Sequence, residues 1–282
     1  MSNSSENASS ADNHAGKTLH RFGVKNPQRL YAKYLRLKSM DSNEATFLGI
    51  LYTDGCLSPK GKNGWRFYLS NTSWQIIETF KESFVKLFNL PEHRIRISQK
   101  IVNGKPFYKA VVDDMRIGQF LTDKYGTFRT LRYPSKVNGL IFPPASLPNN
   151  LQDPFTICQF LKVAFSCDGG VNLYVAKNRY RWLIRNVYLA CKHPVLIKQY
   201  YNLLKKVGVA AKILWQDNLI RIQGKQNLED FANKVGFMEG VQITQHSAYW
   251  QGIEKQKVLH LLIASYGNPK VIYNLPQFRV KI

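Results

Sequence analysis

The sequence predicts an α+β fold in which one αββαββα unit occurs twice. Two nine-residue runs support this prediction, FLGILYTDG at 47–55 and LKVAFSCDG at 161–169. Each run is apolar and helix-like, ends at Asp-Gly, and precedes a similar order of strands and helices. A third observation is charge, because 40 Lys and Arg against 18 Asp and Glu give a formal charge of +22. An internal repeat of this length implies a pseudo-twofold molecule.

The composition limits the possible partners. A chain of 282 residues with a pI near 9.9 favours a polyanionic partner such as nucleic acid. The four cysteines have no CxxC spacing and the six histidines no HExxH or zinc pattern, so a zinc site or a histidine-centred nuclease is not expected. No apolar run approaches the roughly 18 residues of a membrane span. We therefore expect an intracellular, reduced protein that does not bind membranes.

The repeat divides the chain into segments. The first motif helix ends at Asp54, and its Gly49 and Thr53 form a stripe of small residues that would let another helix approach closely. Glycine after each motif Asp is expected to leave the helix with a positive φ. The expected segments are a disordered tail (1–18), a basic extension (19–42), the first unit (43–126), a proline-rich, irregular connector (127–153), the second unit (154–238) and a basic C-terminal extension (239–282).

In the first unit, alternation of polar and apolar residues predicts strands at 57–62, 66–71, 94–101 and 107–112. Helices are expected over 76–88 and 115–126, and the second hairpin turns at Asn103-Gly104. The alternation gives the sheet one apolar face and one polar, basic face. The candidates for DNA contact on the basic face are Arg66, Tyr68, Ser70, Arg94, Arg96, Ser98, Lys100 and Lys109.

The second unit repeats this order. Asp153 as N-cap and Pro154 at the first helical position begin its motif helix, which ends at Asp168. Hairpins are expected at 172–190 and 212–223, and helices over 195–208, 227–236 and, beyond the unit, 256–265. For every candidate on either sheet, an ordinary exposed polar residue is the alternative interpretation. The candidates for DNA contact in this unit are Lys177, Arg179, Arg181, Arg221 and Gln223.

The two aspartates have a chemical rationale. A carboxylate at the C-terminal end of a helix is slightly unfavourable, and placing two such ends together compounds the repulsion. A divalent cation between Asp54 and Asp168 would relieve it, and Mg²⁺ prefers such hard oxygen ligands. Metal ions beside a scissile phosphate can generate the nucleophile and stabilise the attacking and leaving oxygens. Either aspartate alone could simply end a helix, but the duplication favours a metal site.

These two runs and their repeats, over about residues 43–238, resemble the LAGLIDADG homing endonucleases in their two-motif, single-chain form. The resemblance implies motif helices packed at the centre and two antiparallel sheets that form a saddle over double-stranded DNA. It implies that Asp54 and Asp168 bind two or more Mg²⁺ ions and cut opposite strands of a long target site. Mn²⁺ is a plausible substitute, Ca²⁺ is expected to support binding only, and the protein is expected to act as a monomer.

The resemblance also implies supporting residues. A polar residue at the end of the second strand often supports each site; Asn71 fits in the first unit, whereas the second unit offers Cys191 and Lys192. A basic residue is frequent after each unit's final helix. Arg132 and Lys136 are the candidates in the first unit, and Gln242 is a poor equivalent in the second.

Two alternatives stay open. In the second motif helix, Val163 and Ala164 occupy two positions where a small residue followed by a larger one is usual. This departure could shift the packing of the two motif helices, or the exchange of the large and small positions could preserve the packed volume. The same scaffold could also serve an intron-splicing maturase that binds intron RNA, or a DNA- or RNA-binding regulator. Retention of both aspartates favours the endonuclease, because a pure binder needs no carboxylates facing phosphate.

Overall fold

The computed structural model describes residues 40–60, 64–128, 135–137, 140–176, 182–244, 247 and 249–273. None of the helices in these ranges has the length and apolar character needed to cross a membrane. The predicted tail, nearly all of the N-terminal extension and the last nine residues lie outside them. So do four candidate site residues, Arg132, Lys177, Arg179 and Arg181.

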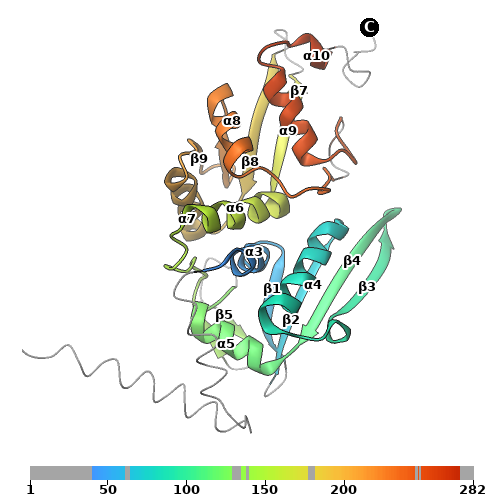
Figure 1. Ribbon diagram of the computed structural model, residues 1–282, viewed down its shortest axis with the longest axis vertical. Helices are drawn as coiled ribbons and strands as arrows, with labels where there is room; N and C mark the ends of the chain where they lie inside the picture. Colours follow the sequence, from blue (N-terminus) through green and yellow to red (C-terminus); the bar gives the residue numbers. More distant parts are fainter. Residues whose placement is uncertain are drawn as a thin grey trace, which may run out of the picture. The chain divides into compact units, whose positions relative to one another are not determined.

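The first unit has the predicted αββαββα order. Its four strands form one antiparallel sheet in the order β1-β2-β4-β3 (Figure 1). The predicted turn at Asn103-Gly104 joins β3 to β4, and both residues have positive φ. The elements are α3 (Ser42–Leu51), β1 (Gly55–Lys60), β2 (Gly64–Asn71), α4 (Trp74–Phe88), the 3₁₀ turn η1 (Glu92–Arg94), β3 (Arg96–Val102), β4 (Lys105–Asp113) and α5 (Met115–Tyr125).

One strand boundary was predicted wrongly. Arg94 lies in the turn η1, and β3 begins only at Arg96. The Ile95 N–H donates to the Glu92 carbonyl at 2.9 Å, so the chain after Pro91 closes a helical turn before it extends. Arg94 is therefore a turn residue beside the sheet and not a member of its alternating face.

The second unit repeats both the element order and the strand order, here β7-β8-β10-β9. Asp153 caps its first helix as predicted, because its carboxylate accepts the Thr156 N–H at 2.9 Å. The elements are α6 (Pro154–Asp168), β7 (Gly169–Val175), β8 (Leu183–Ala190), α7 (Pro194–Lys206), β9 (Lys212–Leu214), β10 (Leu219–Ile222) and α8 (Lys225–Lys234).

The segments outside the repeat also contain regular structure. The connector is not wholly irregular, since β5 (Ser135–Val137) and β6 (Leu140–Phe142) pair as a small antiparallel ribbon. The C-terminal extension contains the predicted helix as α9 (Lys255–Ala264), followed by the short helix α10 (Lys270–Tyr273). Helix α9 packs against both α8 and β7, so the extension is part of the second unit's core.

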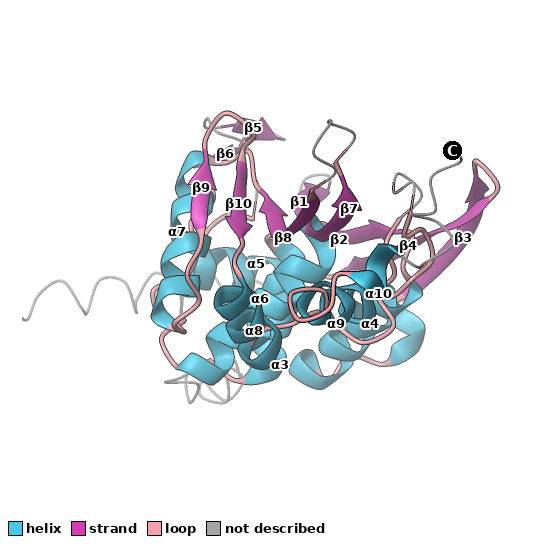
Figure 2. Ribbon diagram, turned by 90° about the horizontal axis from the view of Figure 1, so that it is seen from above, coloured by secondary structure: helices cyan, strands magenta, loops and turns pink. Residues whose placement is uncertain are grey.

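The two motif helices, α3 and α6, pack against each other between the two sheets. Figure 2 shows the strands of both sheets on one side and the helices on the other, with the strands in a concave row. The helix-facing side of each sheet is apolar: Phe67, Leu69, Val187 and Leu189 are fully buried. Alternation then directs their neighbours to the opposite, open face. This is the predicted α+β architecture.

The approach of the motif helices depends on one small residue. A Cβ atom on Gly49 would lie 2.9 Å from the Cβ of Val163 and 3.1 Å from the Phe160 carbonyl oxygen. Bulky Val163 on α6 therefore faces glycine on α3, so the exchanged order of small and large residues preserves close packing.

The glycines after the motif aspartates have a different role from the predicted one. Neither Gly55 nor Gly169 has a positive φ, and Gly169 is extended at φ −99°. Space is the constraint instead. A Cβ on Gly55 would lie 2.9 Å from the Ile50 carbonyl oxygen, and one on Gly169 would lie 2.5 Å from the Phe165 carbonyl oxygen. Each sheet thus begins directly against the last turn of its motif helix.

Candidate active site

Helix α3 ends at Leu51 and not at Asp54 as predicted, so Asp54 lies in the turn between α3 and β1, whereas Asp168 is the last residue of α6. The Cys167 thiol, one residue before Asp168, lies beside the Asp54 carboxylate and lowers its pKa, and Thr53 acts on the same thiol. The charge of Asp54 acts directly on Asp168. Two carboxylates that are 114 positions apart in the sequence therefore share one site.

Both carboxylates are harder to ionise than a free aspartate. The pKa of Asp168 is raised to about 7, first by burial and then by the charge of Asp54, while the Lys255 ammonium lowers it. Burial also raises the pKa of Asp54, which the Cys167 thiol, Lys255 and Asn71 each lower. Part of Asp168 stays open to the solvent, so an ion or a phosphate could reach it. A cation in this position would restore the ionised form of both groups.

The oxygen donors fit a divalent cation. No group of three or more His, Cys, Asp and Glu side chains forms a metal site within the described ranges. Asp54 and Asp168 would therefore supply two hard oxygen ligands, with water and phosphate oxygens completing the shell. Mg²⁺ is commonly held by one or two carboxylates in this way.

The two aspartates are supported unequally. Asn71 ends β2 and donates from Nδ2 to the Asp54 carboxylate at 2.7 Å, while its Oδ1 accepts the Ser73 N–H. Cys191 follows β8 in the second unit, but its thiol donates to the His193 carbonyl at 3.7 Å. The structure thus orients Asp54 through a neighbouring amide and gives Asp168 a different environment.

Lys255 is the site residue that the sequence did not reveal. It begins α9, is only 6% exposed, and donates from Nζ to the carbonyl oxygens of Ser166 and Gly169, both at 2.7 Å. Its charge faces Asp54 and Asp168, and burial lowers its pKa. Lys255 lies beyond the second unit's final helix, whereas Gln242, the poor equivalent considered from the sequence, forms a backbone bridge with Glu254. No motif or spacing around Lys255 distinguishes it from neighbouring lysines.

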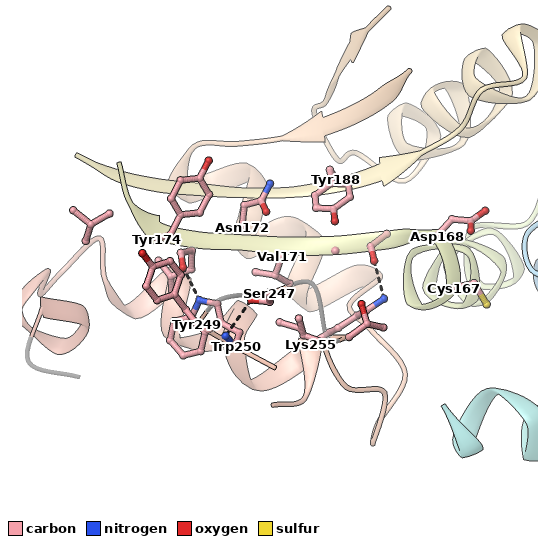
Figure 3. Close-up of a pocket in the computed structure, with 16 residues that line it drawn as sticks. Cys167, Asp168, Val171, Asn172, Tyr174, Tyr188, Ser247, Tyr249, Trp250 and Lys255 are labelled. Atoms are coloured by element: carbon pink, nitrogen blue, oxygen red, sulfur yellow. Dashed lines mark hydrogen bonds between the residues drawn. The ribbon is translucent and has the colours of Figure 1, made fainter. Parts of the chain in front are cut away.

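A cavity of about 710 Å³ opens beside this site. Figure 3 shows Asp168 at the end of α6 and Lys255 directed from α9 toward the start of β7. Asn172 and Tyr174 from β7, and Tyr188 from β8, line the cavity along the open face of the sheet. Sequence analysis did not select these three residues, because Asn and Tyr alternate there without a basic pattern.

The open face of the first sheet bears the predicted basic and polar residues. Register places Tyr68 beside Val111, and Ser70 beside Lys109, which in turn pairs with Ser98. Lys109 lies over the Tyr68 ring, with its Nζ 5.7 Å from the centroid. The candidates on this face are Arg66, Tyr68, Ser70, Arg96, Ser98, Lys100 and Lys109.

The candidates outside this face are less uniform. In the second sheet, Arg221 on β10 pairs with Tyr188, and Gln223 follows the strand; both line a second cavity of about 520 Å³ with Asn172 and Tyr174. Lys136 lies in β5, but its side chain is outside the described residues. For Arg132, Lys177, Arg179 and Arg181 the sequence prediction stands alone.

Comparison with known proteins identifies the fold family. The sequence model of the LAGLIDADG-like domain matches residues 156–236. This match lies within the second unit, which is therefore similar to a LAGLIDADG-like domain over most of its length. No curated protein sequence matches the chain.

Solved structures give a matching result. The meganuclease I-SmaMI bound to uncleavable DNA is 12% identical, with a TM-score of 0.50 over 86% of this chain and 97% of that one. A mesophilic variant of the homing endonuclease I-DmoI is 14% identical (TM-score 0.46, 73% of this chain, 95% of that one). The homing endonuclease I-WcaI, bound to its DNA recognition sequence, is also 14% identical (TM-score 0.37, 79% and 94%).

The I-SmaMI match shows a shared fold. Because the first unit has the same strand order as the LAGLIDADG-like domain, the chain contains two copies of this fold, and the resemblance predicted from the sequence is confirmed.

Proposed function

We propose that this protein is a divalent-metal-dependent DNA endonuclease that makes site-specific double-strand breaks, one strand per aspartate. The observation that supports this most directly is the pairing of Asp54, in the turn after α3, with Asp168 at the end of α6. Two neighbouring carboxylates with raised pKa values repel each other when both are ionised and no cation is bound. A divalent cation removes this repulsion and takes both carboxylates as ligands. A monomer would contain both centres.

The surroundings suit a nucleic-acid substrate. Asp54 directly precedes β1 and Asp168 directly precedes β7, and the open face of the first sheet is basic, as phosphate contact and base-edge reading require. A bound divalent ion would supply Lewis-acid stabilisation of charge at the phosphate and a water of lowered pKa. Asp54 and Asp168 would hold such ions, Asn71 would orient Asp54, and the Lys255 ammonium would add positive charge beside the reacting phosphate.

The metals named for neighbours are those expected from the sequence. Structures of I-DmoI with DNA include one with Ca, one of a variant with Mn and one of another variant with Mg. For this chain we propose Mg²⁺, with Mn²⁺ as a substitute and Ca²⁺ supporting binding only. An intracellular location also remains a prediction.

The test begins without a known target. Duplexes that the protein retains from a randomised DNA library in Ca²⁺ would be sequenced, and the selected duplex would then be incubated with Mg²⁺. We expect cutting of both strands by the wild-type protein. Asp54→Asn and Asp168→Asn should each abolish the double-strand break, leaving at most a nick, while binding in Ca²⁺ persists. Asp123→Asn, on the exposed surface of α5, is the control with the same charge change.

The outcomes separate the functions. Normal double-strand cutting by either active-site variant would remove that aspartate from the mechanism. Specific DNA binding without cutting by the wild type would instead indicate a regulator, and tighter binding of RNA than of DNA would indicate a maturase.

A further inference from the structure

One carboxylate on the open face of the first sheet is shared by cations from the three other strands. Asp113, at the end of β4, is 22% exposed and accepts from Lys60 Nζ on β1 at 2.8 Å. It accepts from Arg66 on β2 through Nε at 2.8 Å and Nη2 at 3.0 Å, and from Arg96 Nη2 on β3 at 2.7 Å. With the strand order β1-β2-β4-β3, this transverse row contains one residue from every strand.

The positive charges in this row exceed the negative charge of Asp113. Three cations around one carboxylate leave a net charge of +2. Hydrogen bonding from Arg66, ahead of that from Lys60 and Arg96, holds the pKa of Asp113 well below its usual range, so the carboxylate stays ionised. Exposed ion pairs contribute little to folding, so stability is a weak reason to gather so many cations. The excess positive charge suits a polyanion.

The arginines keep donors for a partner. Each guanidinium has five N–H groups, and the bonds to Asp113 occupy Nε and Nη2 of Arg66 and only Nη2 of Arg96. Ordering a flexible side chain on binding costs conformational entropy, and the bonds to the Asp113 carboxylate have already ordered both arginines. An arginine held in this way is prepared to donate two parallel bonds to guanine O6 and N7 in the major groove.

The distance between this row and the two active-site carboxylates indicates which base pairs the row would contact. Arg66 lies five residues before Asn71 on β2, and Asn71 bonds to Asp54. At a rise of about 3.3 Å per residue the row is roughly 17 Å from the carboxylates, which corresponds to about five base pairs at 3.4 Å each. The described part of the second sheet has no such row, and Arg221 pairs there with Asp217 at 3.9 Å.

We propose that Asp113 is a positioning residue that fixes Arg66 and Arg96 to recognise guanine in a short block of the target, about five base pairs from the cleavage site and on one side only. This inference rests on the proposed DNA-binding function. Asp113 does not contact the reacting phosphate; it acts through the two arginines.

The experiment measures base preference position by position. Wild type, Asp113→Asn and the charge-matched control Asp123→Asn would bind the same randomised duplex library in Ca²⁺, and the retained DNA would be sequenced. A bidentate arginine contact gives roughly 5- to 150-fold preference for guanine. We expect Asp113→Asn to lose about ten-fold of this preference in one block while its affinity for unrelated duplex does not fall. The Asp123→Asn control should retain the wild-type preference throughout.

A second variant keeps the test independent of folding. Arg66→Lys preserves the charge but not the planar fork, so it should lose preference in the same block with the salt dependence of binding unchanged. Unchanged base preference in both Asp113→Asn and Arg66→Lys would overturn the inference while leaving the endonuclease intact. Loss of preference spread evenly over the whole site would overturn it too. A wild-type protein that retains no sequence-specific DNA would refute the proposed function itself.

Discussion

Replacing Gly49 by alanine tests how tightly α3 and α6 hold the two carboxylates. The new Cβ would lie 2.9 Å from Val163 Cβ and 3.1 Å from the Phe160 carbonyl oxygen. Non-bonded carbons prefer about 3.5–4.0 Å, so the helices would have to separate by roughly 0.5–1 Å. Helix propensity alone favours alanine by about 1 kcal/mol, and overpacking costs about 1–3 kcal/mol. We expect the free energy of unfolding to fall by up to about 2 kcal/mol instead of rising.

The larger effect should be on cleavage. Asp54 lies five residues after Gly49, and Asp168 lies five residues after Val163, so a shift at the contact moves one carboxylate relative to the other. A misplacement of about 1 Å can reduce a rate about 100-fold. Urea denaturation of the metal-free protein gives the stability change. Single-turnover cleavage of the selected duplex in Mg²⁺, compared with binding in Ca²⁺, separates the rate from DNA affinity.

An exchange variant completes the test. Gly49→Ala combined with Val163→Gly moves the small residue from α3 to α6 and should recover part of both losses, with a coupling energy of at least about 1 kcal/mol. The opposite outcome is a Gly49→Ala variant that is more stable by the helix propensity of alanine and cuts at the wild-type rate. That result would show that the packing of α3 on α6 does not depend on this contact.

Three further predictions concern the carboxylate site. Asn71→Ala should slow cutting of one strand about 10- to 100-fold, because Asp54 loses its orienting amide, so nicked DNA accumulates; Cys191→Ala is the comparison and should cut both strands normally. Lys255→Met should lower single-turnover cleavage about 100-fold or more while DNA binding in Ca²⁺ is retained, and equal losses in both assays would mean that its role is structural. Asp168→Asn should stabilise the metal-free protein at pH 8 by about 1 kcal/mol, a value reduced for solvent exposure. The pKa of Asp168 is raised to about 7 in the folded state, so the wild-type protein loses folding stability as the pH rises from about 4 to 7 and this carboxylate ionises. Thermal melts in a chelator should show this gain disappearing near pH 4, and a pH-independent gain would contradict the electrostatic cause.

Much of the architecture was predictable because it is recorded in local patterns. The two Asp-Gly runs identify the repeat, and alternation in strands such as 66–71 identifies which side chains face the core. The turn at Asn103-Gly104 follows from the positive φ that these residues tolerate. In each case the determining residues are neighbours in sequence, so periodicity alone places them.

What the sequence by itself determined, then, is the duplicated αββαββα unit, its basic face and the Asp54–Asp168 pair. Only the tertiary structure decided which other side chains meet them. Lys255 bonds to a carbonyl 86 residues away, and Asp113 shares cations from three strands that are distant in sequence. Gly55 and Gly169 are required because each sheet begins close to its motif helix, and not because they have a positive φ. An Asp-Gly pair in the sequence does not distinguish these two reasons. The reason is physical: burial, desolvation and shared charge depend on which surfaces pack together, and that is a property of the whole fold and not of any sequence window.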